Sequence, residues 1–433
     1  MTAADSARRW LILADDLTGA ADCAIAFGRR GLDAAVTWGE AAGIADRDLA
    51  VLAYDADSRG LSGDAAAARH AALLARWFAP DRVLFKKIDS TLRGQPAAET
   101  AATLAVLAAR TGSAFGICAP AFPATGRTTL EGRVRVDGRP LEAAEVWRRD
   151  HTYASADLRA ILAGAGIRSE TVSLATVRGT GRGGDLVADL VADLAAELAR
   201  IAATGPAVAV CDAETEADLD RIAAAGLSLA PAPFFIGSAG LAHALAALPA
   251  APAMQPPSHA PSRFGSLIVV GSLAAASRAA ARRLAGRDGV THLPVDPGTL
   301  LVDGPARAAF AGRVAAILEA GGDALVEITT AGEPDMALGP RLARGLAEAL
   351  DPVACRIGAV AATGGETAAA LLARFGVDGI RLVDEIEPGV SLGLTLGRLA
   401  VPVATKAGAF GDADSLIRIR ERLRAARLEG RFS

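Results

Sequence analysis

Two adjacent aspartates follow an apolar run close to the start of the sequence. The run Leu11–Ala14 has the composition of a buried strand, and Asp15 and Asp16 come directly after it in the segment LADDLTGAAD. Neighbouring carboxylates repel each other, and burying them is costly unless cations or hydrogen-bond donors pair with them. Such a pair could accept a proton in catalysis, so both residues are candidate catalytic groups. The alternative is structural, because aspartate also caps the amino terminus of a helix.

A second polar cluster begins directly after the apolar run Arg82–Phe85. The segment KKIDSTLRG contains Lys87, Asp89, Ser90 and Arg93. Arginine can bind a carboxylate through two parallel N–H bonds, and aspartate and serine can exchange hydrogen bonds with hydroxyl groups. Together these residue types suit an anion that carries hydroxyls, so we predict that the four residues bind a substrate of this kind. A solvated charged loop is the structural alternative.

Glycine-rich turns follow three apolar runs in the last part of the chain. Glycine lets the backbone approach a ligand closely, and the amino terminus of a helix offers N–H groups to a phosphate. The turns therefore predict a nucleotide-phosphate site, and three ordinary connections between strands and helices are the alternative. The third turn is preceded by Lys406, one of the few lysines of the chain. The candidate residues are Ser272, Gly364, Gly365, Glu366, Thr367 and Gly408.

A loop rich in proline and glycine runs from Cys118 to Leu141 and contains Arg127. Its last part, VRVDGRPL, places Asp137-Gly138 between two extended segments, and Asp-Gly is a strong hairpin signal. We predict a hairpin whose turn lies at these two residues. The loop could fold over a bound ligand or be an ordinary ordered connection.

Familiar phosphate and metal motifs are missing or occur in the wrong context. No GxxxxGK[ST] segment occurs, which excludes a P-loop protein. Gly179–Gly184 matches GxGxxG, but the acidic residue expected about 20 residues later is missing, so a NAD-dependent dehydrogenase is a weak alternative. The five histidines and four cysteines show no zinc-type spacing, and we assign no metal ligand.

The composition argues against some classes of protein. The chain has 433 residues and a net charge of −4, with acidic and basic residues interspersed. A nucleic-acid-binding protein would normally show a basic patch or excess. No apolar run approaches the roughly 20 residues of a membrane span, and the polar start does not look like a signal peptide. We therefore expect a cytoplasmic protein with no nucleic-acid or membrane partner.

Short apolar runs alternate with alanine-rich amphipathic stretches along most of the chain. This alternation predicts strand–helix units on a largely parallel sheet, and hence an α/β fold. A proline-rich break at 251–263 is typical of a linker, because proline interrupts helices and central strands. We expect two α/β domains, 1–250 and 264–433, with the polar clusters at the carboxyl ends of their strands. The run Ile380–Ile386 is expected to begin one more strand–helix unit.

Over nearly its whole length the sequence resembles the four-carbon acid sugar kinases. Several of the shared segments are weak singly, but jointly and in this order they are specific. They are ADDLTGAAD at Ala14–Asp22, KKIDSTLRG at Lys86–Gly94, APAFPATGRTTLEG at Ala119–Gly132, IGSAGLA at Ile236–Ala242, GGETA at Gly364–Ala368, EIEPGVSLG at Glu385–Gly393 and TKAGAFGDADSL at Thr405–Leu416.

The resemblance implies a kinase that transfers phosphate from ATP, with Mg²⁺, to the 4-hydroxyl of a four-carbon sugar acid. The first domain would bind the acid and the second the nucleotide, with both held in the cleft between the domains. D-threonate or D-erythronate is the expected acid, and a 3-oxo-tetronate is the alternative. The acid would contact Asp15, Asp16, Lys87, Asp89, Ser90 and Arg93, and the nucleotide would contact the six glycine-turn residues named above.

Two segments depart from the family pattern and bear on the identity of the acid. Leu141–Glu145 stands where members often have a His-Glu-Thr-like segment, and the stretch after Gly271-Ser272 lacks a glutamine of the pattern.

For the reaction itself we expect Lys87 and Arg93 to hold the carboxylate of the acid. One of Asp15 and Asp16 would accept the hydroxyl proton, and the other would orient the substrate or a magnesium-bound water. A non-catalytic sugar-acid sensor would explain the first cluster but not the glycine turns. The alanine-rich surfaces permit a homodimer.

Overall fold

The computed structural model describes residues 8–39, 48–112, 114–179, 187–248, 257–329, 338–408 and 410–432. The described residues form two compact units, each of which draws on two separate parts of the chain. The first unit comprises the described residues of Met1–Leu32 and Ala50–Ala253, and the second comprises those of Asp33–Leu49 and Met254–Ser433. The first six residues of the predicted linker, 251–256, lie outside the described residues.

The sheet of the first unit is parallel throughout. Every pair of neighbouring strands runs in the same direction, which places the carboxyl ends of all of them at one edge. The strand runs are short and buried, as expected for a sheet covered on both faces. Their order across the sheet is β3 (Val51–Asp55), β1 (Arg9–Ala14), β4 (Arg82–Lys87), β11 (Phe234–Gly237), β5 (Phe115–Ala119), β10 (Ala207–Cys211) and β9 (Ser169–Val172).

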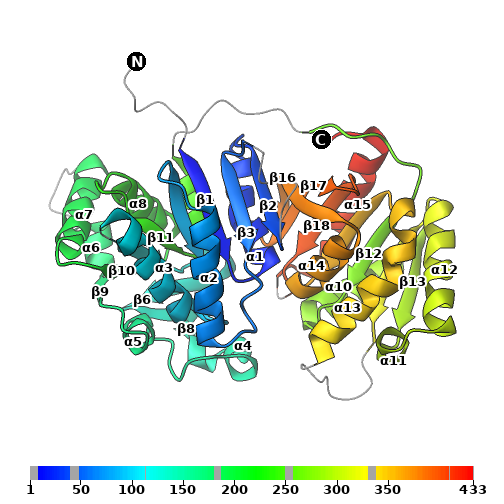
Figure 1. Ribbon diagram of the computed structural model, residues 1–433, viewed down its shortest axis with the longest axis horizontal. Coiled ribbons are helices and arrows are strands. Elements are labelled where there is room, and N and C mark those ends of the chain that lie inside the picture. Colours follow the sequence, from blue (N-terminus) through cyan, green and yellow to red (C-terminus); the bar gives the residue numbers. More distant parts are fainter. Residues whose placement is uncertain are drawn as a thin grey trace. The chain divides into compact units, whose positions relative to one another are not determined.

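Helices cover both faces of this sheet (Figure 1). One layer contains α1 (Leu17–Gly28), α7 (Val187–Ala202), α8 (Glu216–Leu227) and α9 (Ala239–Ala247), which contact one another in the order α1, α9, α8, α7. The other layer contains α2 (Gly63–Trp77) and α3 (Pro96–Thr111), which pack side by side. Shorter helices of this unit are η1 (Pro123–Thr125), η2 (Leu141–Ala143), α4 (Glu145–Arg149), α5 (Leu158–Gly164) and α6 (Leu174–Arg178).

A small antiparallel sheet extends from the first unit and confirms the predicted hairpin. It consists of β6 (Arg127–Leu130), β7 (Arg133–Val136) and β8 (Arg139–Pro140). Asp137 and Gly138 form the turn between β7 and β8 with φ values of 50° and 75°. Two successive positive φ values are what a tight two-residue hairpin turn requires, which is why Asp-Gly occurs here.

The second unit has a mixed sheet. Five of its strands are parallel, and the last three pair antiparallel with their neighbours. The order is β13 (Val290–Val295), β14 (Asp323–Ile328), β12 (Ser266–Val270), β15 (Ala359–Thr363), β18 (Pro402–Lys406), β17 (Val390–Gly397), β16 (Val377–Glu387) and β2 (Ala34–Trp38).

Two features of this sheet differ from the sequence-based expectation. The run Ile380–Ile386 does not begin a strand–helix unit, because β16 turns directly into β17 and pairs with it antiparallel. Strand β2 lies in the range 1–250 expected for the first domain, yet it belongs to the second unit. Backbone pairing of Val36 with Ile380, and an ion pair of Asp33 with Arg381 at 2.8 Å, hold it there.

Helices again cover both faces of the second sheet. On one face α10 (Ala275–Ala285) and α15 (Ser415–Glu429) share an apolar core with β12, β15, β17 and β18, built from residues such as Ile268, Leu284 and Leu423. Each fully buried side chain of this size contributes about 1.5–3 kcal/mol. The other face carries α11 (Pro297–Leu301), α12 (Pro305–Glu319), α13 (Gly339–Leu350), η4 (Asp351–Arg356) and α14 (Gly365–Arg374).

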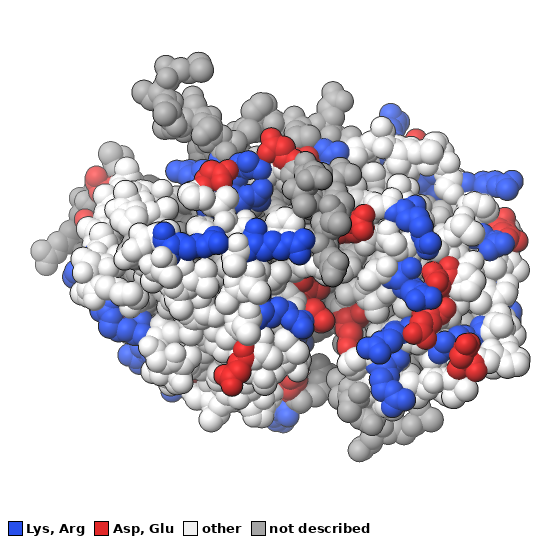
Figure 2. Space-filling model, in the orientation of Figure 1, with Lys and Arg blue, Asp and Glu red and all other residues white. Residues whose placement is uncertain are grey.

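On the face shown in Figure 2, basic and acidic side chains lie next to each other over the second unit. None of the helices in the described ranges is both long enough and apolar enough to span a bilayer.

Candidate functional site

The predicted aspartate pair lies at the carboxyl end of β1, where the chain enters α1. Asp16 caps this helix, since its Oδ1 accepts a hydrogen bond from the backbone N–H of Gly19 at 3.1 Å. Its Oδ2 accepts from the hydroxyl of Thr18 at 2.7 Å. A Cβ at Gly19 would lie 2.5 Å from Asp16 Oδ1 and 2.7 Å from Lys87 Nζ, so only glycine leaves room for both side chains. Asp16 therefore caps α1 as the structural alternative predicts, and its catalytic role stays a prediction.

An arginine that the sequence analysis did not single out pairs with both aspartates. Arg59 Nε and Nη2 lie 2.7 and 3.1 Å from the two carboxylate oxygens of Asp15. Its Nη1 and Nη2 lie 3.0 and 2.8 Å from the oxygens of Asp16. The backbone N–H groups of Ser58 and Arg59 also donate to the carbonyl of Asp15. The repulsion between the two carboxylates is thus offset by one shared cation.

A sequence signal for Arg59 existed, because the segment ADSRG follows the buried strand β3. Since β3 is the parallel neighbour of β1, the residues after the two strands meet at one edge of the sheet.

The segment after β4 supplies the third part of this cluster. Asp89 accepts two hydrogen bonds from Arg93, from Nε at 3.0 Å and from Nη2 at 2.8 Å. Arg59 Nη2 lies 3.8 Å from Asp89 as well, which joins this segment to the aspartate pair. Ser90 is buried in the same turn. Three carboxylates and three cations, Lys87 included, therefore gather at the carboxyl ends of β1, β3 and β4.

The electrostatics of this cluster keep Asp16, Asp89 and Lys87 ionised. Burial raises the pKa of the Asp16 carboxyl, but the charges of Arg59 and Lys87 lower this pKa by more than burial raises it, so the net shift is downward. At Asp89 burial is likewise outweighed by Arg93 and Arg59, and the pKa falls well below its usual range. The pKa of Lys87 is raised, because the nearby aspartates outweigh its burial.

The glycine turns of the second unit also converge at the carboxyl end of their sheet. Ser272 follows β12, Gly364 follows β15 and Gly408 follows β18, and these three strands are parallel neighbours. A Cβ at Gly408 would lie 2.3 Å from Ser272 Oγ, and one at Gly271 would lie 2.0 Å from Thr367 Oγ1. Gly364 is the N-cap of α14 and supplies no side-chain cap. The first N–H groups of this helix therefore adjoin turns in which glycine backbone lies close to the side chains of Ser272 and Thr367.

A lysine at the end of β18 adds a buried cation to these turns. The Lys406 ammonium donates to Ser277 Oγ at 3.2 Å and to the Ala407 carbonyl at 3.2 Å, and Ser277 in turn donates to the Gly408 carbonyl. Its side chain is buried, and burial lowers the pKa of Lys406 to about 8.

Two family models match the chain in the order of its two units. A sugar-binding N-terminal domain matches residues 10–245, and a nucleotide-binding C-terminal domain matches residues 267–416. A D-threonate kinase of Cupriavidus necator is 43% identical over 415 residues, covering 94% of this chain and 96% of that one. A D-threonate kinase of Bordetella bronchiseptica is 35% identical, with 96% and 98% covered. The chain belongs to the four-carbon acid sugar kinase family.

More distant likenesses agree with the fold of this kinase. A 3-oxo-tetronate kinase of Methylobacterium radiotolerans is 29% identical, covering 93% of this chain and 96% of that one. Crystal structures of a Haemophilus influenzae protein and a Salmonella typhimurium protein match with TM-scores of 0.71 and 0.77 at 19% and 22% identity. They cover 95% and 96% of the kinase, and 100% and 99% of their own chains. The predicted fold of two α/β domains is thereby confirmed.

Family membership also decides between the classes of protein considered from the sequence. The chain is a kinase, so the dehydrogenase and the non-catalytic sensor are set aside. The GxGxxG segment on which the dehydrogenase rested lies, apart from Gly179, outside the described residues.

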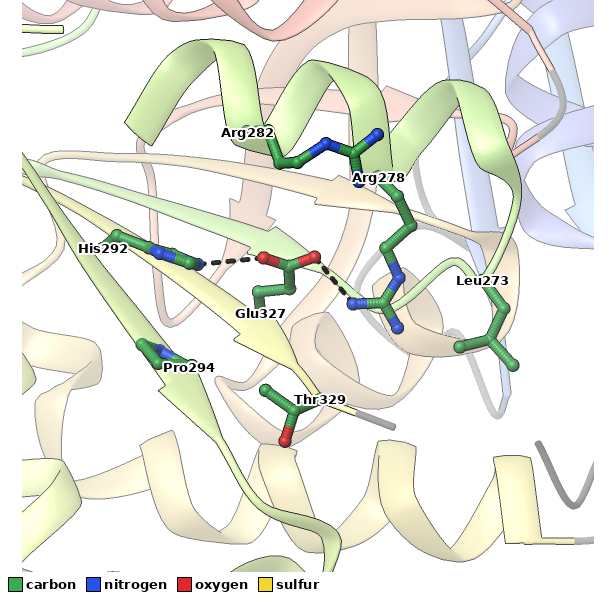
Figure 3. A pocket seen from close by; sticks show the side chains of 7 residues that line it. All are labelled: Leu273, Arg278, Arg282, His292, Pro294, Glu327 and Thr329. Atoms are coloured by element: carbon green, nitrogen blue, oxygen red, sulfur yellow. Dashed lines mark hydrogen bonds and ion pairs between the residues drawn. The ribbon is translucent and has the colours of Figure 1, made fainter. Parts of the chain in front are cut away.

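A shallow hollow of about 430 Å³ lies beside the turn of Ser272 in this kinase (Figure 3). Glu327 is at its centre and accepts from Arg278 Nη1 at 2.7 Å and pairs with His292 Nε2 at 2.9 Å. None of its residues was predicted from the sequence. They are Leu273, Arg278, Arg282, His292, Pro294, Glu327 and Thr329.

Proposed function

We propose that this kinase transfers the terminal phosphate of ATP to the 4-hydroxyl of D-threonate. The likeness to D-threonate kinases at 43% and 35% identity over nearly the whole chain carries the choice of acid. The likeness to 3-oxo-tetronate kinases is lower, at 29% and 27%, and that to a D-erythronate kinase covers 39% of the chain. D-erythronate is the second candidate acid, and a 3-oxo-tetronate the third.

The acid is proposed to bind at the cluster of Asp15, Asp16, Lys87, Asp89, Ser90 and Arg93. Arg93 contacts Asp89 through Nε and Nη2, and its Nη1 makes no hydrogen bond among the described residues. A planar guanidinium whose Nη1 is left for a ligand can bind a carboxylate, and the Lys87 ammonium adds a point charge. Asp89 and Ser90 supply oxygens for the hydroxyls of the acid.

Asp16 is proposed to accept the proton of the attacking hydroxyl, with Asp15 orienting Arg59. Both carboxylates bind Arg59, but the Asp16 side chain is 15% exposed and that of Asp15 only 3%. A base must contact the substrate, so the more exposed carboxylate is better placed. Arg59 then holds the charge of the pair fixed while the proton is transferred.

The nucleotide is proposed to bind at Ser272, Gly364, Gly365, Glu366, Thr367 and Gly408. The close approach of Gly408 to Ser272 and the uncapped start of α14 support a phosphate site made largely of backbone N–H groups. Lys406, which the sequence analysis noted but did not assign, is added as a cation for the phosphates.

The residues fit Mg²⁺ that is bound chiefly through the nucleotide. The described part of the chain contains no group of three or more aspartate, glutamate, histidine or cysteine side chains that could hold a metal. Mg²⁺ in kinases commonly uses one or two carboxylates together with phosphates and water. The carboxylate oxygens of Asp15 or Asp16 could accept hydrogen bonds from a water bound to Mg²⁺. The metal would neutralise charge at the phosphates. The binding of both ligands between the domains, and a homodimer, stay predictions.

A coupled ADP-release assay over D- and L-threonate, D- and L-erythronate and their 3-oxo forms tests this proposal. We expect the highest kcat/KM with D-threonate and ATP-Mg²⁺. A higher kcat/KM with a 3-oxo-tetronate would change the substrate, and no turnover with any of the acids would refute the substrate class.

A further inference from the structure

A second charged cluster lies inside the first unit, directly behind the proposed acid site. Its members are Ser58, His70, Lys86 and Glu99, and each side chain is at most 1% exposed. They come from the loop after β3, from α2, from β4 and from the first turn of α3. None of them is assigned a role in the proposed reaction.

Glu99 is the centre of this cluster, and its two carboxylate oxygens bind different segments. Oε2 lies 2.6 Å from the Lys86 ammonium. Oε1 accepts from the Ser58 hydroxyl at 2.6 Å and lies 3.3 Å from His70 Nε2. Burial raises the pKa of Glu99, but Lys86 and the bonds of His70 lower it far more, so the carboxylate is ionised. Burial and the Lys86 charge lower the pKa of His70, which favours its neutral form.

Two of the three segments that Glu99 contacts continue directly into the acid site. Ser58 precedes Arg59, the arginine that pairs with the aspartates. Lys86 precedes Lys87, and the Lys86 ammonium also donates to the Lys87 carbonyl at 2.6 Å. One carboxylate therefore fixes the backbone that carries two of the three cations of that site.

We propose that Glu99 is a positioning residue of this kinase, which holds the Ser58-Arg59 loop and the Lys86-Lys87 strand end in register for acid binding. This inference rests on the proposed function, because it assumes that the Arg59 and Lys87 cluster binds the acid. Stability alone explains the cluster poorly. Removing two charges from water costs several kcal/mol per ion, and apolar replacements of buried ion pairs are often as stable.

The replacement Glu99→Gln tests the role with little change of shape. Glutamine has one acceptor oxygen where glutamate has two, so it can accept from the Ser58 hydroxyl or from the Lys86 ammonium but no longer joins the two segments. We expect kcat/KM for D-threonate to fall about 10- to 100-fold, mainly through KM, since small displacements of binding groups have effects of this size. The KM for the nucleotide should stay unchanged. Glu99→Asp keeps the charge but is one methylene shorter. Its kcat/KM for D-threonate should lie between the values of the wild type and of Glu99→Gln.

A matched control is available in the same unit. Asp218 is also 1% exposed and also binds an arginine, Arg178, at 2.7 Å, but it caps α8 and has no contact with the acid site. Asp218→Asn should lower the melting temperature without changing the KM for either substrate. The double variant Ser58→Ala/Glu99→Gln should have a kcat/KM for D-threonate little lower than that of Glu99→Gln alone. Either change by itself already breaks the link that Glu99 makes between the Ser58 loop and the Lys86 strand end.

Crystal structures of the wild type and of Glu99→Gln give a readout that does not depend on turnover. We expect the contacts of Arg59 with Asp15 and Asp16 to be lengthened or lost in the variant. If the wild type phosphorylates none of the acids, the proposed function fails, and the Arg59 contacts alone decide the positioning role. Unchanged contacts of Arg59 in the Glu99→Gln structure would overturn the inference. So would a Glu99→Gln enzyme whose melting temperature falls like that of Asp218→Asn while its KM for D-threonate stays that of the wild type.

Discussion

Arg59 Nε donates to Asp15 Oδ2 over 2.7 Å, and the two residues are 44 positions apart in the chain. The contact forms because β1 and β3 are parallel neighbours, so the residues after each strand meet at one edge of the sheet. It makes the costly carboxylates of the LADDLTGAAD segment part of an ion-paired cluster. The cluster is where we expect the largest effects of substitution.

Arg59→Lys should reduce kcat/KM for D-threonate about 100-fold, because lysine keeps the charge but cannot contact both aspartates through a planar fork. Steady-state kinetics at saturating nucleotide would measure this loss. Arg69→Lys is the control, since within the described part of the chain Arg69 binds only the carbonyls of Ala56 and Asp57 and the Asp57 carboxylate. Equal kinetics of Arg59→Lys and Arg69→Lys would show that the fork is dispensable.

Asp16→Asn should lower kcat by about 10²- to 10⁴-fold, the usual contribution of a general base. Its melting temperature should change little, because asparagine is also a good helix cap and Arg59 keeps Asp15 as a partner. Asp15→Asn should have the smaller effect on kcat. Wild-type turnover in both variants would rule out the aspartate pair as the base, and a larger loss in Asp15→Asn would exchange the two roles.

Arg93→Ala should raise the KM for D-threonate far more than the KM for the nucleotide. The removed guanidinium is proposed to bind the acid carboxylate, and its loss also frees Asp89, whose ion pair it supplies. Initial-rate measurements with each substrate varied in turn give the comparison. An equal rise of both KM values would contradict the assignment of acid and nucleotide to separate units.

Gly408→Ala should weaken nucleotide binding and leave the KM for D-threonate unchanged. The new Cβ would lie 2.3 Å from Ser272 Oγ, so the turn must shift at the place where phosphate is proposed to bind. Calorimetric titration with ADP would measure the loss. Gly312→Ala in α12 is the control, because a Cβ there meets no atom within 4 Å. Unchanged ADP affinity in Gly408→Ala would place the phosphates elsewhere.

Nucleotide affinity should fall as the pH rises through about 8, because burial lowers the pKa of Lys406 to about 8 and only its protonated form attracts phosphate. Lys406→Met should bind ADP weakly and with little change across this range. The effect of Lys406 on stability has the opposite sign. Between pH 8 and the usual lysine pKa of 10.5, the unfolded chain binds more protons at this group than the folded chain does. The free energy of unfolding contributed by Lys406 therefore rises with pH in this range. A wild-type affinity that is flat across pH 8 would exclude Lys406 from the phosphate site.

Much of the molecule was determined by local patterns in the sequence. Apolar runs followed by alanine-rich stretches predicted the parallel sheets, and Asp137-Gly138 predicted its hairpin, because strand burial and turn geometry depend on a few adjacent residues. The placement of Asp15, Asp16 and the KKIDSTLRG segment after strands followed from the same patterns.

Only the tertiary structure decided which distant side chains meet. The pairing of Arg59 with Asp15 and Asp16, the link from Glu99 to Ser58 and Lys86, and the transfer of β2 to the second unit depend on strand order. Strand order is set by the packing of whole elements, and no local periodicity encodes it. For the same reason the residues of β16 alone did not reveal that it pairs antiparallel with β17 and β2.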